Sequence, residues 1–203
     1  MNEQSPFQNA VKQQTTNDAA KSAVASFRKL ASQLAQRSIQ GNQLMRAQPD
    51  RLVSLIQPKH IGRLMMFFYD PKLKEKLPYY DRFPLVIPIQ MYSDGFLGLN
   101  LHYLPPNFRA ILMDTLYNGV YRNTQLNEKQ RIRISYNIVM ATSRNRFYVP
   151  CVKRYLYEHQ RSRFLVIEPN DWNIALFLPT ERFAKKSKQH VFEQSKQKIR
   201  QGH

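Results

Sequence analysis

The chain has 203 residues, of which 42% are hydrophobic and 12% aromatic, which is enough for one folded domain of ordinary size with extensions. Its formal net charge of +17 favours a partner that carries phosphates or acidic side chains. The single cysteine, Cys151, excludes an intramolecular disulfide and a zinc site built from cysteines.

The sequence shows no leader-like or membrane-spanning segment. Residues 1–14 read MNEQSPFQNAVKQQ and lack the apolar stretch of a signal peptide. No run approaches the roughly 20 apolar residues that are needed to cross a bilayer. We therefore expect a soluble, intracellular product in a reducing compartment.

The positive charge is unevenly distributed along the chain. Lys and Arg outnumber Asp and Glu by nine to three in residues 1–64, by eleven to three in 106–165 and by seven to four in 166–203, whereas 65–105 carry four of each kind. Separated basic blocks around a neutral centre indicate surfaces that face phosphate or an acidic protein. Nucleic acid is the leading candidate.

The N-terminal part predicts a flexible arm followed by a long helix. Residues 1–17 are rich in Gln, Asn, Thr and Ser, so they cannot bury enough apolar surface to order themselves. From about residue 18 to 40, apolar residues recur at spacings of three and four, which indicates an amphipathic helix. We expect its apolar stripe to dock on the chain's own domain or on another subunit; a nucleic-acid contact through the basic face is a third alternative. The candidate interface residues on the stripe are Val24, Phe27, Leu30 and Leu34.

A strand-rich segment follows. The apolar run LMMFFYDP after Arg63 predicts a buried strand, and PLVIPIQMY at 84–92 predicts a second, with an edge or bulge at Pro88 because proline lacks a backbone donor. Ser93, Asp94 and Gly95 then predict a tight hairpin, since Asp and Gly tolerate positive φ. In the next strand, alternation places four residues on the core side: Leu97, Leu99, Leu101 and Tyr103.

Asn100 and His102 share the other, less apolar face of that strand. This pair could serve in catalysis or recognition, or could satisfy backbone groups in the interior. No carboxylate is placed by the sequence to complete a catalytic triad with His102. The pair is therefore interpreted as scaffold.

Helical spacing returns after Pro105 and Pro106. It predicts one helix ending at Asn118-Gly119, a second from residue 127 or 128 to about 141, and a third over CVKRYLYEHQ, which follows Pro150. The segments RFLVIEP and WNIALFLP predict two more strands, and ERFAKKSKQHVFEQSKQKIRQGH a polar helix or frayed tail.

The pattern as a whole predicts an α+β fold. We expect a small β-barrel or curled antiparallel sheet of about five strands with a helical insertion, flanked by a long N-terminal helix and a basic C-terminal tail or helix. Residues 1–60 would form the arm and N-terminal helix, 61–180 the α+β core domain and 181–203 the basic tail.

Sequence patterns for catalysis, metals and cofactors are missing. The five histidines are dispersed, and the motifs HExxH, GxxxxGK[ST], GxGxxG and GxSxG do not occur. The carboxylates of the neutral block show no spacing typical of a metal-dependent nuclease. We expect no metal, no cofactor and no enzymatic activity.

The strongest functional signal is the mixture of basic and aromatic residues in 122–163. Arginine binds phosphate with paired hydrogen bonds and aromatic rings stack on unpaired bases, although the same rings could be the buried side of solvated basic helices. An acidic protein partner also stays open. The candidate nucleic-acid-binding residues, with three from the basic tail, are Arg131, Arg133, Arg144, Arg146, Lys153, Arg154, Arg161, Arg163, Lys185, Lys186 and Lys188.

Residues 69–114 carry a family resemblance. The blocks LPYYDRFP and GFLGLNLHYLPP, and the helix that follows at once, resemble the DNA end protector proteins of contractile-tailed bacteriophages. The resemblance implies a minor virion protein that binds the ends of packaged linear double-stranded DNA, shields them from host exonuclease and helps complete the head or join it to the tail. It implies location in the virion, after assembly in the host cytoplasm, and no catalytic residues.

A second hypothesis from a different class is a structural adaptor of the phage neck, tail or baseplate. Such a protein would contact other phage structural proteins rather than DNA, and could be an oligomer within the virion. Within the block that resembles the family, Asp81 and Arg82 would form a local ion pair or contact a neighbouring subunit.

Overall fold

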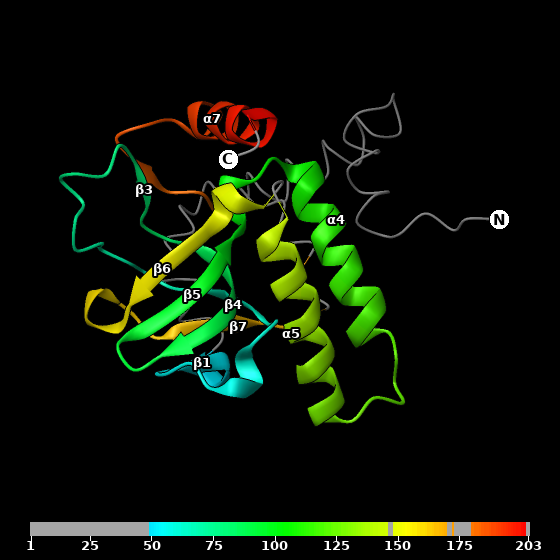
Figure 1. Cartoon of the computed structure of the whole chain (residues 1–203). Coiled ribbons are helices and arrows are strands. Elements are labelled where there is room, and N and C mark those ends of the chain that lie inside the picture. Colours follow the sequence, from blue (N-terminus) through cyan, green and yellow to red (C-terminus); the bar gives the residue numbers. More distant parts are fainter. Residues whose placement is uncertain (1–48, 146–147, 170–171, 173–179, 202–203) are drawn as a thin grey trace, which may run out of the picture.

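A six-stranded antiparallel sheet forms the centre of the computed structural model, which describes residues 49–145, 148–169, 172 and 180–201 (Figure 1). The strand order is β1-β7-β2-β4-β5-β6. The strands are β1 (Leu52–Val53), β2 (Leu64–Met66), β4 (Leu85–Tyr92), β5 (Gly95–Asn100), β6 (Val152–Leu156) and β7 (Phe164–Ile167). A two-stranded sheet pairs β3 (Tyr80–Asp81) with β8 (Phe183–Ala184).

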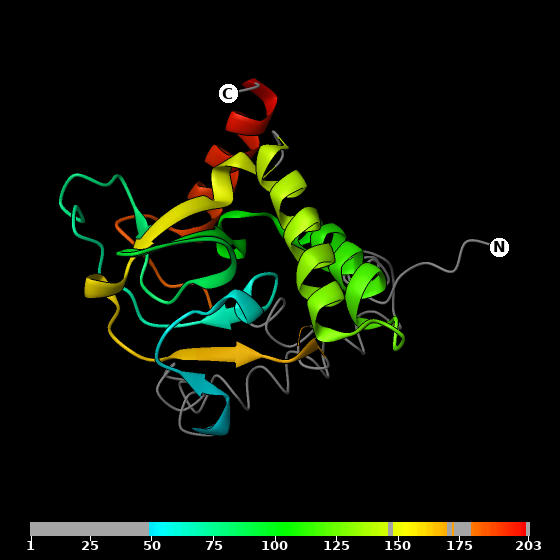
Figure 2. The same cartoon turned by 60° about the horizontal axis from the view of Figure 1, so that its bottom comes forward.

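The main sheet curls but stays open. Its outer strands are β1 and β6, and no pairing joins them within the described residues. Figure 2 shows β7 and β1 well separated from β5 and β6. The predicted α+β class with a curled antiparallel sheet is confirmed, whereas the barrel alternative is wrong. Strand β7 lies between β1 and β2, so a late segment of the chain pairs with two early strands.

Strands β4 and β5 form the predicted hairpin. Their register shifts between Pro88 and Gln90, which confirms a bulge beside the proline. At the turn, Tyr92 pairs with Gly95, but neither Asp94 nor Gly95 has a positive φ. Gly95 is required for another reason: a Cβ there would overlap the carbonyl oxygen of Tyr155 on β6.

The predicted helical insertion between β5 and β6 is confirmed. Helix α4 (Pro106–Leu116) continues into a π-helical turn, Tyr117–Tyr121, and α5 (Glu128–Arg144) returns antiparallel beside it (Figures 1 and 2). Helix α5 contacts β4. Its inward face holds Ser135 and Val139, whereas Tyr136 is 39% exposed. Gly62 is needed opposite Ser135, because a Cβ on Gly62 would overlap the Cβ of Ser135.

The prediction of a helix over CVKRYLYEHQ is wrong. Residues 152–156 form strand β6, which pairs with β5 in a register that sets Tyr155 opposite Phe96 and Lys153 opposite Gly98. The aromatic ring of Tyr155 stacks on Phe96, with ring centroids 5.1 Å apart, inside a cluster that includes Phe67 and Phe164. Pairing and aromatic packing therefore override a pattern that a helix could also satisfy.

The C-terminal segment folds back onto the core. Residues Lys188–Gln201 form helix α7, which contacts the 3-10 turns η3 (Leu101–Tyr103) and η5 (Val149–Cys151) at the top of Figure 1. The predicted N-terminal helix and the strand over 173–179 lie outside the described residues. The division at residues 60 and 180 stays a prediction, although β1 already belongs to the sheet.

Gly95→Ala is expected to destabilise the fold by about 2 kcal/mol or more, because the methyl group would force β5 away from β6. Urea denaturation measures the loss. Gly119→Ala is the matched control, since its Cβ would lie 3.2 Å from the movable end of Ile138, and its free energy of unfolding should change by less than about 0.5 kcal/mol. Equal losses at both positions would contradict the close approach of β5 and β6.

Candidate nucleic-acid interface

The predicted arginines of α5 divide into one that supports the fold and two that face solvent. Arg131 is half-buried, and its Nε donates to the carbonyl oxygen of Leu126 at 3.0 Å. This contact holds the loop before the helix. Arg133 and Arg144 are exposed and form no ion pair within the described residues. They are available to a partner, whereas Arg131 is committed to the loop.

Arg154 on β6 is used to hold the β4–β5 hairpin. Its guanidinium pairs with Asp94, donates to the carbonyl oxygen of Phe96 at 3.3 Å and lies over the ring of Tyr92 at 4.3 Å. The pair with Asp94 is largely exposed, so it adds little to stability by itself. The hairpin turn and Arg154 therefore orient one another.

The remaining candidates lie on separate segments. Arg161 is exposed and lies 3.8 Å from Asp70, and Arg163 is exposed with no side-chain partner in the described part of the chain. Lys185 has a φ of 69° and donates to three carbonyl oxygens of the 71–77 turn, including that of Lys74 at 2.7 Å. Lys186 and Lys188 are exposed, and Arg146 lies outside the described residues.

The side chain of Lys153 lines a pocket, together with that of Arg154. This pocket, which we call the tyrosine pocket, has a volume of about 390 Å³ and lies between residues 69–81, Tyr103, β6 and α7. The Lys153 ammonium lies 4.3 Å from the centre of the Tyr103 ring. Cations in the lining are Lys153, Arg154 and Lys198, and the tyrosines are Tyr69, Tyr79, Tyr80, Tyr103 and Tyr155.

The charge of Lys153 is poorly compensated. Burial and the nearby Lys198 ammonium lower the pKa of Lys153 to about 8, from an ordinary value of 10.5. No carboxylate pairs with either lysine among the described residues. Asp81 is the one acidic residue in the lining, and its carboxylate is engaged elsewhere. Two lysines that share a pocket whose one described carboxylate is engaged elsewhere favour a bound anion.

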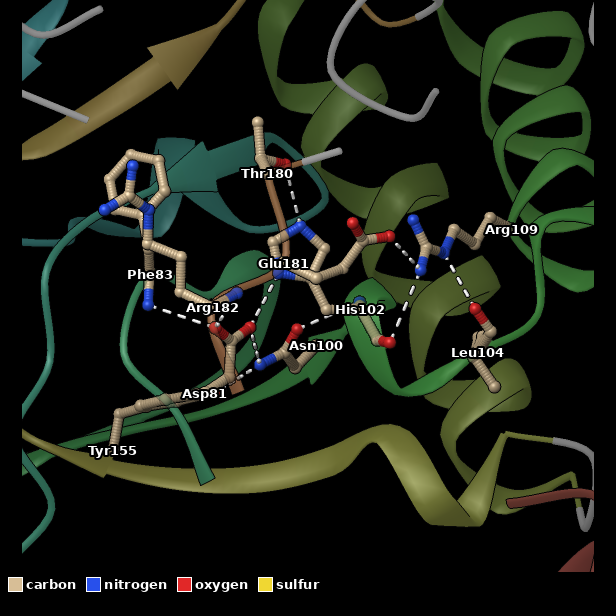
Figure 3. A network of polar contacts seen from close by, with 10 residues as sticks. All are labelled: Asp81, Phe83, Asn100, His102, Leu104, Arg109, Tyr155, Thr180, Glu181 and Arg182. Carbon is tan, nitrogen blue, oxygen red and sulfur yellow. Dashed lines mark hydrogen bonds and ion pairs between the residues drawn. The ribbon is translucent and has the colours of Figure 1, made fainter. Parts of the chain in front are cut away.

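Asp81 lies at the centre of a buried polar network (Figure 3). One carboxylate oxygen is 2.6 Å from Nδ1 of His102 and accepts from the Asn100 amide at 3.2 Å. The other accepts from the backbone N–H of Phe83 at 3.0 Å and of Arg182 at 3.4 Å. Burial alone would raise the pKa of Asp81, but the His102 ring and these donors lower it below its ordinary value.

The Asn100–His102 pair is thereby used inside the fold. Nε2 of His102 is 3.0 Å from the Thr180 hydroxyl, and Asn100 also donates to the Tyr155 hydroxyl at 3.0 Å. Asp81, His102 and Thr180 are linked in a row like a catalytic triad, but the side chains of His102 and Asp81 are 0% and 1% exposed. No substrate could reach the imidazole, and the interpretation as scaffold agrees with this geometry.

Arg109 extends the network to helix α4. Its guanidinium is 1% exposed and donates to Leu104 O at 2.8 Å and to the Glu181 carboxylate at 2.8 Å (Figure 3). Burial alone would raise the pKa of Glu181, but the Arg109 guanidinium lowers it below its ordinary value. Residues 180–182, which are distant in sequence, are thus tied to η3 and α4.

The sequence predicts neither Lys198 as a site residue nor the approach of Tyr69, Tyr79 and Tyr103 to Lys153. Lys153 and Tyr155 alternate, and a strand places them on one face, but a helix over this segment would separate them. The predicted contact of Asp81 and Arg82 with a subunit stays a prediction. Within the fold, Asp81 is buried and paired with His102, and Arg82 is exposed.

No group of three or more His, Cys, Asp or Glu side chains could hold a metal ion in the part of the chain that the structure describes. None of the helices in the described ranges is long and apolar enough to span a bilayer.

A protein-family comparison matches nearly the whole chain. The family is described as phage T4 terminal DNA protecting protein, and the match covers residues 4–199. It confirms the resemblance carried by residues 69–114. No curated protein and no solved structure matches the chain with significance.

Arg109→Met should leave the Glu181 carboxylate buried without its partner, at a cost of about 3–5 kcal/mol. Urea denaturation measures it. The double variant Arg109→Met with Glu181→Gln removes the stranded charge, so its loss should be smaller than the sum of the two single losses by about 1 kcal/mol or more. Strict additivity would show that the two side chains do not interact.

Lys153 should make stability depend on alkaline pH. Its folded pKa of about 8 lies below the unfolded value, so between pH 8 and 10.5 this residue binds more protons in the unfolded chain, and its contribution to the free energy of unfolding rises with pH. Relative to Lys153→Met, the wild type should gain on the order of 2 kcal/mol across this window. Urea denaturation of both proteins at several pH values measures the gain, and a constant difference would contradict the lowered pKa.

Proposed function

Because the chain belongs to the family of phage T4 terminal DNA protecting proteins, we propose that it is a minor virion protein that binds the ends of packaged linear double-stranded DNA. The match over residues 4–199 is the observation that carries this proposal. A protein bound to the DNA end would then protect it, since an exonuclease needs a free terminus. No catalytic group is required for this role, and we propose that the protein is not an enzyme.

The distribution of charge supports binding to phosphates. The chain carries a formal net charge of +17, and several of its exposed cations form no ion pair within the described residues. They lie on different segments of the fold, so they can follow a backbone without reading bases. These cations are Arg133, Arg144, Arg163, Lys186 and Lys188. Affinity from such contacts comes largely from counterion release.

A role in completing the head or joining it to the tail is the protein-binding side of the proposal. Ile111 on α4 is 45% exposed and Tyr136 on α5 is 39% exposed, and both are apolar side chains that a protein partner would cover. The same observation favours the second candidate function, a structural adaptor of the neck, tail or baseplate. DNA binding separates the two.

Purified protein should bind a linear duplex more tightly than a closed circle of the same sequence and protect it from an exonuclease. The slope of log affinity against log salt should be steep, at about −0.9 for each neutralised phosphate. Filter binding across a salt series measures the affinities for line and circle and the salt slope, and digestion with an exonuclease measures the protection. The double variant Arg133→Gln with Arg144→Gln removes two positive charges and should make the slope less steep by up to about two.

Binding that is weak, insensitive to salt and equal for line and circle would overturn DNA-end binding. The adaptor role would then account for the basic segments as protein contacts.

A further inference from the structure

The tyrosine pocket combines uncompensated positive charge with an aromatic lining. Lys153 and Lys198 share it without a carboxylate partner among the described residues, and the Asp81 carboxylate is hydrogen-bonded to His102 and to the backbone N–H of Phe83. A half-buried ammonium near a second ammonium raises the free energy of the empty pocket. An anion that enters would remove that repulsion.

The tyrosines identify the rest of the ligand. Tyr79 and Tyr103 have ring centroids 5.8 Å apart, and Tyr103 also carries the Lys153 ammonium on its face. Tyr80, on β3, is half-buried in the same lining. Tyr79 and Tyr103 are 8% and 5% exposed, so their rings are largely covered, and the half-buried Tyr80 is the most open ring of the lining. A ring for the base beside cations for the phosphate is the combination found in single-strand sites.

We propose that the tyrosine pocket binds the terminal nucleotide of a DNA strand, with its phosphate paired to Lys153 and Lys198 and its base against the tyrosines. The inference rests on the proposed function and assigns it a site. A volume of about 390 Å³ lies within the roughly 300–1,000 Å³ of small-ligand pockets, which suits one nucleotide and excludes a duplex.

This occupancy explains selection of ends without any reading of sequence. Nucleotides inside a duplex are paired and stacked, and moving one into a pocket costs the energy of unpairing and unstacking. A terminal nucleotide frays or lies in an overhang, so it pays less of this cost. The exposed cations would bind any duplex backbone, and the pocket would add affinity only at a terminus.

A nucleotide fits the pocket better than an acidic peptide does. A glutamate or aspartate side chain would neutralise the lysines but would leave the aromatic lining without a matching flat surface. The base supplies that surface and the phosphate supplies the charge. An acidic peptide is therefore the competing occupant that the experiments must separate.

The first test compares end preference, defined as the affinity for linear DNA divided by the affinity for closed circular DNA at one salt concentration. The double variant Lys153→Met with Lys198→Met should lower this ratio by about ten-fold, the loss expected for a charge-assisted hydrogen bond. Lys196→Met is the control for the Lys198 substitution, because it removes one charge from an exposed position on the same helix α7 that lies outside the pocket lining. Its ratio should not change.

The outcomes distinguish the site from the function. If the wild-type protein shows no end preference, the proposed function fails. If the wild-type protein prefers ends and the double variant keeps the full ratio, the pocket inference is overturned while the function stands. Urea denaturation of each variant confirms that it is folded; the Lys198→Met single variant, at an exposed position, repeats the test with the least effect on the fold.

The second test uses calorimetric titration of the full chain with deoxyadenosine 5′-monophosphate, deoxyadenosine, inorganic phosphate and hexaglutamate. The monophosphate should bind at least about ten-fold more tightly than either of its parts, because it uses both the rings and the lysines. Lys153→Met with Lys198→Met should abolish the difference. Tighter binding of hexaglutamate, or equal binding of phosphate and the nucleotide, would overturn the assignment.

Discussion

The buried carboxylate of Asp81 is the constraint on which the arrangement of the core depends. A charged group that leaves water must be fully hydrogen-bonded, and this one is met by His102, by Asn100 and by backbone N–H groups. These donors belong to segments that are far apart in the sequence, namely β5 with its 3-10 turn and the residues before β8. Satisfying one carboxylate therefore fixes where those segments meet.

The same constraint shapes the electrostatics of the tyrosine pocket. Asp81 lies in the lining, but its carboxylate accepts from His102, Asn100 and the backbone N–H of Phe83 and pairs with neither lysine. The carboxylate contacts His102 in the interior, where the Asp81 side chain is 1% exposed. Among the described residues, no carboxylate offsets the cost of keeping Lys153 half-buried, and its ammonium contacts only the Tyr103 ring there. A group that destabilises the fold in this way points to a ligand that supplies the missing charge.

The parts of the fold that sequence predicts well are those controlled by local rules. Alternation and turn residues predict the β4–β5 hairpin with its bulge at Pro88, and helical spacing after Pro106 predicts α4 and α5. Strand β6 could not be separated from a helix, because its aromatic residues satisfy both periods over a short run. Only pairing with Gly95 and Phe96 decides the outcome, and that pairing is a tertiary fact.

The candidate site shows why counting charges predicts a partner better than a binding surface. Arg131, Arg154 and Lys185 look like free cations in the sequence, yet each holds a loop or turn of its own chain. Lys153 indicates the candidate site best, and it differs from the other lysines in its burial and not in its charge. Long-range attraction depends on the sum of the cations, whereas selection of a DNA end needs a cavity that only a strand terminus can enter. In our proposal the two properties reside in different residues, so a variant should lose one and keep the other.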